Sequence, residues 1–262
     1  MRDYDELFIG HADYVSQKWT HYPCVYDELL RPSIEAGKPM TVLEIGVQNG
    51  GSLQILEKYL PTGSQIHGVD IDPRCGALRF SPNIHFHLGN AADSGFIART
   101  FGGMKFDLMI DDGSHQSREV VCSFFNLFPM LSEGGIYLIE DMEHSYYANS
   151  GGGFRRPRSS VEFFKRLVDA LNVDHFEMND VIDNIEVMNF LHGYAPQIKR
   201  ISFYTGICAI EKYHRPKAAP FECVMSGKIE KVNPCSQYRK TTEQLKLLID
   251  ANRQMFGGKR KQ

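Results

Sequence analysis

The sequence predicts an α/β protein built on a doubly wound, mostly parallel seven-stranded sheet that ends in an antiparallel hairpin. Short apolar runs alternate with helical patterns, which is typical of a parallel sheet with helices on both faces. The expected parallel strands cover residues 41–45, 65–70, 83–88, 106–110 and 136–139. The runs 198–204 and 207–212 are separated only by Thr205 and Gly206. A connection this short makes a hairpin, so the last two strands are expected to be antiparallel.

The first strand leads into a glycine-rich turn over residues 46–51, and a helix is expected over residues 52–59 because Ser52 is a good N-cap. Pro61 ends that helix. A second clear helix is expected over residues 118–130, where large apolar side chains recur at helical spacing on one face. The pair 134–135 is Gly-Gly, which is expected to stop this helix and lead into the fifth strand.

Composition places the chain among ordinary globular proteins. It has 262 residues, 42% of them hydrophobic, and a formal net charge of −3, so neither nucleic acid nor an anionic membrane is an expected partner. Its six cysteines are scattered without the close pairs of a zinc site or a small disulfide framework. The N-terminus lacks a signal-peptide core, and no run approaches the roughly 18 apolar residues of a membrane helix. We therefore expect a cytoplasmic protein with reduced thiols.

The chain divides into three expected parts. Residues 1–38 form a helical segment that caps the acceptor side, residues 39–212 form the core, and residues 213–262 form an extension with a helix over 241–255 and a solvated basic tail. In the first segment, five side chains are expected to anchor it to the core: Trp19, Tyr22, Tyr26, Leu29 and Leu30. Together with residues 142–195, this segment is expected to shape a pocket and lid and to contribute to a homo-oligomer interface.

Acidic side chains follow two of the expected strands directly. Residues 111–115 read Asp-Asp-Gly-Ser-His after the fourth strand, and Glu140 and Asp141 follow the fifth. Neighbouring strands lie about 5 Å apart, so these carboxylates repel one another unless a cation lies between them. A hard divalent cation suits carboxylate oxygens. The alternative is that Asp-Asp-Gly only makes a turn, but the second acidic pair at the next strand end weighs against it.

The glycine turn after the first strand is a candidate cofactor site, because open α/β sheets bind cofactors at strand ends. It runs from Glu44 to Ser52 and is spaced Glu-x-Gly-x-x-x-Gly, which disfavours a dinucleotide pyrophosphate. Asp70 ends the second strand, where an acid accepts hydrogen bonds from ribose hydroxyls; Asp72, its rival, is expected to cap the next turn instead. Asp93 lies where it can meet an adenine amino group, with a solvated loop acid as the equal alternative.

These motifs together resemble a known family. The order Glu-x-Gly, Val-Asp, Ile-Asp-Asp-Gly-Ser-His and Ile-Glu-Asp resembles the metal-dependent sugar O-methyltransferases of antibiotic biosynthesis, of the mycinamicin and macrocin type, and the related rhamnosyl methyltransferase and cephalosporin-hydroxylase-like group. Residues 17–22 and the closing hairpin are also similar, although an acid expected before Lys18 is Gln17 here. The resemblance covers roughly residues 15–212 and implies a Rossmann-like class I methyltransferase fold that binds S-adenosylmethionine.

The resemblance also implies residue roles. The implied metal ligands are Asp112, Glu140 and Asp141, and the implied general base is His115. The implied cofactor-binding residues are Glu44, Gly46, Gln48, Ser52, Asp70 and Asp93, together with Asp111, which either contacts the cofactor or positions its loop. His115 has an alternative role as the start of the following helix. His144 is interpreted as a loop histidine, and the Gly/Arg loop over residues 151–158 either recognises an anionic acceptor or is merely solvated.

The chemistry expected of such a site is methyl transfer to an oxygen. A bound Mg²⁺ or Mn²⁺ lowers the pKa of a coordinated hydroxyl, and a neutral histidine can take its proton. The expected acceptor is a hydroxyl of a sugar or a glycosylated small molecule. A catechol is the alternative acceptor, and a non-catalytic S-adenosylmethionine-binding subunit is the alternative without catalysis. A nicotinamide-dependent oxidoreductase is disfavoured by the glycine spacing and the terminal hairpin.

Overall fold

The computed structural model describes residues 3–176, 193–194, 196–217, 219–232 and 234–256. Over these residues the strands form one seven-stranded sheet in the order β3-β2-β1-β4-β5-β7-β6. The strands are β1 (Thr41–Ile45), β2 (Gln65–Asp70), β3 (Ile84–Leu88), β4 (Phe106–Asp111), β5 (Leu131–Ile139), β6 (Ile198–Tyr204) and β7 (Ile207–Lys212). The first five are parallel, whereas β7 pairs antiparallel with both β5 and β6. The predicted fold class and its closing hairpin are confirmed.

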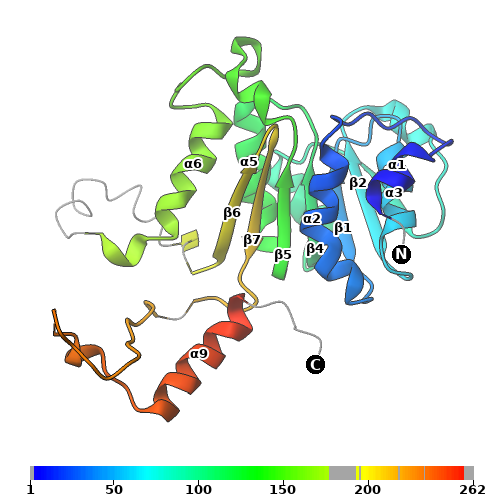
Figure 1. Ribbon diagram of the computed structural model, residues 1–262. Coiled ribbons are helices and arrows are strands. Elements are labelled where there is room, and N and C mark those ends of the chain that lie inside the picture. Colours follow the sequence, from blue (N-terminus) through cyan, green and yellow to red (C-terminus); the bar gives the residue numbers. More distant parts are fainter. Residues whose placement is uncertain (1–2, 177–192, 195, 218, 233, 257–262) are drawn as a thin grey trace.

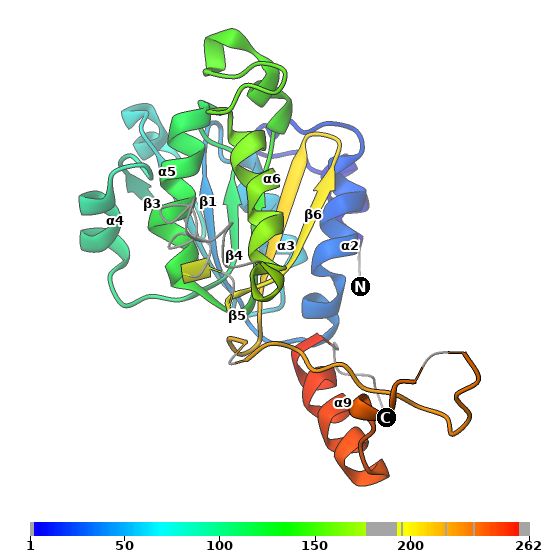
Figure 2. The same ribbon diagram turned by 90° about the vertical axis from the view of Figure 1, so that its left-hand side faces the viewer.

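Helices cover both faces of this sheet (Figures 1 and 2). They are α1 (Tyr4–Ile9), α2 (Tyr22–Glu35), α3 (Gly51–Tyr59), α4 (Ser94–Phe101), α5 (Ser117–Leu127) and α6 (Ser160–Ala170), whereas α9 (Thr242–Phe256) lies below the sheet in Figure 1 and covers neither face. The helices α1 to α3 pack on the face that includes Leu108 and Ile110, and α4 to α6 pack on the face that includes Met109. Successive β4 residues therefore enter opposite cores, as the two-residue period of a strand requires.

The sheet brings the ends of three central strands to one edge. In the register of the sheet, Asp111 at the end of β4 lies beside Ile45 of β1 and Ile139 of β5. From β1 the chain continues through β2 to β3 on one side of the sheet. It then returns to β4 beside β1 and continues to β5 on the other side, so the strand order reverses between β1 and β4. Such a reversal opens a crevice at the carboxyl ends of the strands. In Figure 1 this edge is at the top, where the loop before α2 crosses.

The two largest differences from the predicted element boundaries lie in the fifth strand and in the helix before it. The fifth strand begins at Leu131, so Gly134 and Gly135 lie inside it rather than before it. Leu131 pairs with Phe106 across a bulge, and a Cβ on Gly135 would lie 3.0 Å from the backbone oxygen of Asp107. The two glycines therefore allow the irregular pairing at the start of β5 rather than ending the helix before it. The helix predicted over residues 118–130 ends as α-helix at Leu127 and continues as one 3₁₀ turn.

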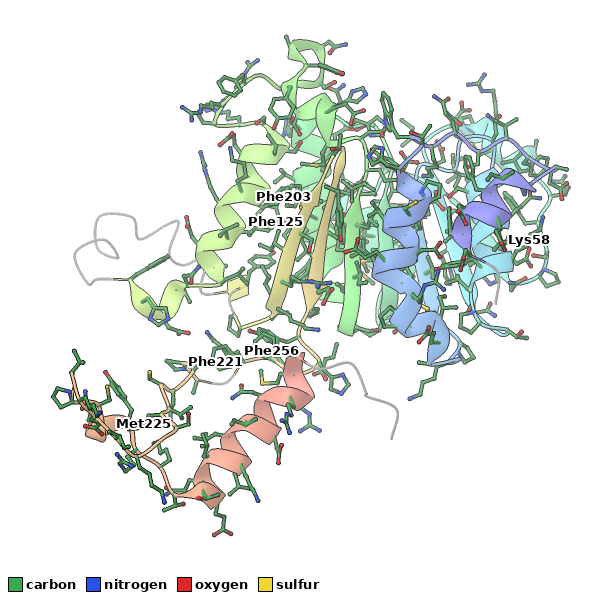
Figure 3. The ribbon with its side chains drawn as sticks, in the orientation of Figure 1. Lys58, Phe125, Phe203, Phe221, Met225 and Phe256 are labelled. Atoms are coloured by element: carbon green, nitrogen blue, oxygen red, sulfur yellow. The ribbon has the colours of Figure 1, made fainter. Side chains whose placement is uncertain are left out.

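Both end segments contain the predicted helices. In the first segment Tyr22 and Tyr26 are buried as predicted, but Trp19 is 55% exposed and so anchors no core. In the extension, Phe256 of α9 lies 5.6 Å from Phe221 between ring centroids (Figure 3). The basic tail lies outside the described residues, as do residues 177–192 and 195 of the lid expected over 142–195. The described helices include none that is long and apolar enough to cross a membrane.

Candidate active site

A cavity of about 830 Å³ opens at the carboxyl ends of β1, β2 and β4. Its volume lies within the range of about 300–1,000 Å³ that is usual for ligand pockets. The glycine turn forms one wall, the acidic turn after β4 forms another, and residues 15–20 close it from the N-terminal side. Of the residues implied as cofactor ligands, the cavity is lined by Glu44, Gly46, Gln48, Ser52, Asp70 and Asp111.

A buried lysine links two of the acids. The Nζ atom of Lys18 lies 2.6 Å from Asp112 Oδ2 and 2.7 Å from Glu140 Oε2, and the Lys18 side chain is only 2% exposed. The pKa of Lys18 stands well above its usual value: burial acts to lower it, but the carboxylates of Glu140 and Asp112 raise it by more. The ammonium therefore stays charged. The Tyr26 hydroxyl donates to Glu140 Oε1, so both oxygens of that carboxylate are hydrogen-bonded.

Asp141 is held from the same segment. Its Oδ1 accepts hydrogen bonds from Trp19 Nε1 at 3.1 Å and from the Tyr22 hydroxyl at 2.9 Å. Its backbone has φ +51°, an uncommon left-handed conformation for a residue other than glycine. The other oxygen, Oδ2, lies 3.6 Å from His115 Nε2, and His115 also has a positive φ of +55°. Two residues other than glycine with a left-handed backbone conformation, both lining one cavity, indicate a functional arrangement.

These contacts leave one group suited to a metal ion. Within the described residues, Asp112, His115 and Asp141 each offer a ligand atom, and the three atoms lie within 4.8 Å of one another. Carboxylate oxygens are good ligands for Mg²⁺ and Mn²⁺, and Mn²⁺, the softer of the two ions, also accepts an imidazole nitrogen. The structure thus brings two of the three implied ligands together with the implied base. Glu140 lies beside them, with its oxygens bonded to Lys18 and Tyr26; its role as a ligand stays a prediction.

Glu44 is the strongest structural sign of a bound cofactor. It is fully buried, yet neither carboxylate oxygen has a hydrogen bond of normal geometry among the described residues; the Ser52 hydroxyl lies near enough to act on its pKa without forming one. Burial raises the pKa of Glu44 to about 7, and the Lys18 ammonium acts to lower it. An unpaired buried carboxyl group is costly unless a ligand supplies the missing donor. A cationic amino group of S-adenosylmethionine fits this requirement.

The remaining implied cofactor residues divide between the cavity and its surroundings. Asp70 accepts backbone hydrogen bonds from Gln48 at 2.9 Å and from Asp72 at 2.8 Å, which ties the glycine turn to the end of β2. Asp72 caps the next turn, as predicted. Asp93 is exposed, accepts a hydrogen bond from the Gly95 backbone as the N-cap of α4, and is not among the residues that line the cavity.

Asp111 faces the cavity from within the core. Its side chain is buried, and burial raises its pKa to about 7, while the hydrogen bond from Tyr137 acts to lower it. The Tyr137 hydroxyl donates to Asp111 Oδ2 at 3.3 Å. The Asp112 backbone N–H donates to Ile45 O at 3.0 Å, so the chain after Asp111 is tied to the end of β1. These contacts suit a residue that fixes the acidic turn, and Asp111 also lines the cavity, so both of its implied roles stay predictions.

Gly46 allows the glycine turn and the acidic turn to touch. It has φ +92°, and a Cβ there would lie 2.0 Å from the Asp112 backbone oxygen.

We expect Gly46→Ala to lower the free energy of unfolding by about 3 kcal/mol or more and to abolish binding of S-adenosylhomocysteine, measured by denaturant unfolding and calorimetry. Gly63→Ala is the matched control, because Gly63 has φ +91° but only the Pro39 side chain at 3.4 Å. Its cost should be about 1–2 kcal/mol. Equal losses of unfolding free energy in Gly46→Ala and Gly63→Ala would contradict the close approach of the glycine turn to the acidic turn.

Sequence reasoning assigned no role to Lys18 and did not place Trp19, Tyr22 and Tyr26 at the acids. One signal was present, since Lys18, Tyr22 and Tyr26 recur at intervals of four residues. Tyr22 and Tyr26 are one turn apart on α2 and therefore share a helix face. That spacing is equally typical of an ordinary buried helix face, so it did not single out a site.

Comparison with known proteins agrees with the site geometry. Residues 43–142 match the family described as methyltransferase domain. Over 168 residues the chain is 35% identical to the 8-demethyl-8-alpha-L-rhamnosyl tetracenomycin-C 2'-O-methyltransferase of Streptomyces olivaceus, covering 60% of this chain and 43% of that protein. Over 143 residues it is 38% identical to the mycinamicin VI 2''-O-methyltransferase of Micromonospora griseorubida, covering 50% and 35%. The chain thus spans less than half the length of these curated relatives.

A solved methyltransferase structure also resembles this chain. The MycE methyltransferase from the mycinamycin biosynthetic pathway, in complex with Mg, SAH and mycinamycin VI, superposes with a TM-score of 0.69 at 26% identity, over 83% of this chain and 54% of that one. The sheet order, the reversed last strand and the acidic edge are therefore those of a methyltransferase fold. Residues 43–142 are a methyltransferase domain, in a chain that resembles the sugar O-methyltransferases of antibiotic biosynthesis.

Proposed function

We propose that the protein is a divalent-metal-dependent O-methyltransferase that moves a methyl group from S-adenosylmethionine to a hydroxyl of a sugar or glycosylated small molecule. The observation that carries this proposal is the position of the Asp112, His115 and Asp141 group, which lines the same cavity as the unpaired Glu44 carboxyl group. Relatives support the acceptor class, because two of them are named for methylating a rhamnosyl tetracenomycin and mycinamicin VI. The MycE complex with Mg and SAH supports the cofactors.

Two groups of residues in the cavity have separate tasks in this proposal. Glu44 and the glycine turn hold the amino-acid part of the cofactor, and Asp70 lies where the ribose hydroxyls belong. Asp112 and Asp141 hold the cation. When bound, the sulfonium supplies an electrophilic methyl group, and the cation lowers the pKa of a coordinated hydroxyl. Binding both partners in one cavity supplies much of the rate, because the nucleophilic oxygen is then held near the methyl carbon.

His115 is the proton acceptor in this proposal. Its Nε2 atom is 3.6 Å from Asp141 Oδ2, so it faces the place where a coordinated hydroxyl would lie. On its other side its ring packs against His144, with 4.8 Å between the ring centroids. The ring is thus oriented from both sides, and it can take the hydroxyl proton as methyl transfer proceeds.

Calorimetry of the chelator-stripped protein tests this function. Wild type should bind S-adenosylhomocysteine and then Mg²⁺, whereas Asp112→Asn should keep the first and lose the second. The control is Asp169→Asn, which changes an exposed acid on α6 and should bind both S-adenosylhomocysteine and Mg²⁺ as wild type does. Binding of S-adenosylhomocysteine without a metal site would overturn the metal dependence. No binding of S-adenosylhomocysteine would overturn the whole proposal.

A further inference from the structure

Trp19 is a large apolar side chain left exposed at the rim of the active-site cavity. It is the one tryptophan of the chain. It lines the cavity, yet the residue is 55% exposed, although an indole of this size usually buries most of its surface. The helices that follow it do not use it for packing, since Tyr22 and Tyr26 fill the core instead. Its exposure therefore calls for a ligand-based explanation.

The indole ring is held in a fixed place. Its Nε1–H donates to Asp141 Oδ1 at 3.1 Å, and the same oxygen accepts a hydrogen bond from the buried Tyr22. The polar atom of Trp19 is thus engaged with a residue of the metal group, and the exposed remainder is the apolar ring. A tryptophan with its N–H bonded and its ring in contact with solvent is the arrangement used where one end of a ligand is apolar.

The position of Asp141 relates this ring to the proton acceptor. One Asp141 oxygen contacts Trp19, and the other faces His115 Nε2 at 3.6 Å. A row of rings continues beyond His115: His144 lies 4.8 Å from it, and Tyr147, 48% exposed, lies 5.2 Å from His144. A ligand that reaches the metal group thus meets Trp19 on one side of Asp141 and His115 on the other.

We propose that Trp19 contacts the acceptor directly, with the C–H face of a pyranose ring packed on the exposed indole face. This inference rests on the proposed function and specifies how its acceptor is held. The C–H face of a pyranose is apolar, whereas its hydroxyls point outward from the ring edge. Packing that face on Trp19 leaves an edge hydroxyl directed at Asp112 and Asp141, with His115 within reach of its proton. Ring contact thereby selects which part of the acceptor meets the methyl group.

The fluorescence of Trp19 gives a direct readout, because no other tryptophan contributes. The probe is methyl α-L-rhamnopyranoside, added to wild type loaded with S-adenosylhomocysteine and Mg²⁺. If the sugar covers the indole, the acrylamide quenching constant should fall by about half, in keeping with loss of solvent contact at a half-exposed ring. An unchanged quenching constant at saturating sugar, or no binding of the sugar at all, would overturn the proposal.

Two substitutions test the ring contact by sugar titration. Trp19→Leu removes the flat face and should raise the dissociation constant of the rhamnoside about tenfold. Trp19→Phe keeps a flat face without the N–H and should restore most of the affinity. Both variants should still bind S-adenosylhomocysteine, because Trp19 contacts only the acceptor. Absence of S-adenosylhomocysteine binding in wild type would instead be a failure of the proposed function. Equal sugar affinity of Trp19→Leu and wild type would overturn the contact, as would failure of Trp19→Phe to improve on Trp19→Leu.

Discussion

Replacing Lys18 with methionine is expected to lower the free energy of unfolding by about 3–5 kcal/mol. The side chains of Lys18 and Glu140 are 2% and 1% exposed, so water cannot replace the ion pair. Methionine fills a similar volume but leaves Glu140 buried without its cation. Burial already raises the pKa of Glu140 to about 8, so without the Lys18 ammonium this group must take up a proton at neutral pH and loses the ion pair altogether. Asp112 loses the same partner, although its side chain is 21% exposed and is partly relieved by solvent. Unfolding by guanidinium at neutral pH measures the loss.

Two controls separate a buried ion pair from a general effect of losing a lysine. Lys165→Met removes an exposed pair with Glu162 on α6 and should change stability by about 0–1 kcal/mol. Lys18→Met combined with Glu140→Gln removes both charges and should recover a large part of the loss, since glutamine can still accept the Tyr26 hydrogen bond. A loss in Lys18→Met no larger than that in Lys165→Met would show that the pair does not stabilise the fold.

Replacing His115 with alanine is expected to lower kcat with a sugar acceptor by about 10²–10⁴-fold. An alcohol is a poor nucleophile while it keeps its proton, and alanine cannot take that proton. A catechol is more acidic, so its methylation should suffer much less from the same change. Steady-state kinetics with a rhamnoside and with a catechol give the two ratios, and calorimetry with Mg²⁺ accompanies them.

His144→Ala is the matched control, because this histidine packs beside His115 with its ring tilted but hydrogen-bonds Ser150 at 3.0 Å through Nδ1. It should cost far less activity than His115→Ala. Similar losses for both acceptors in His115→Ala would contradict the role of proton acceptor. Loss of Mg²⁺ binding in His115→Ala would assign the imidazole to the metal instead, alongside Asp112 and Asp141.

The contacts of Lys18 give the N-terminal segment a place in the active site. Lys18, Trp19, Tyr22 and Tyr26 together donate hydrogen bonds to all three acids implied as metal ligands. They neutralise part of the negative charge and engage both oxygens of Glu140 and one of Asp141. The segment expected to cap the acceptor side thus also determines which acid oxygens face the cavity.

The sequence by itself determined the sheet, its closing hairpin and the edge that carries the acids. Apolar runs of strand length alternating with helical patterns are local signals, and acids that directly follow β4 and β5 must emerge at one edge of a parallel sheet. The glycine turn was visible for the same reason, because Gly46 lies directly after β1. Where a role depends only on the end of a strand, the chain alone is enough to predict it.

Only the tertiary structure decided which charges meet. Lys18 lies 94 residues before Asp112 and 122 before Glu140, and no local pattern specifies a contact over that distance. Asp93 shows the converse limit: from the sequence an adenine contact and a solvated loop acid were equal alternatives, and in the fold its carboxylate accepts a hydrogen bond from the Gly95 backbone. Ion pairs and ligand contacts depend on the approach of distant segments, which the packing of the two cores fixes.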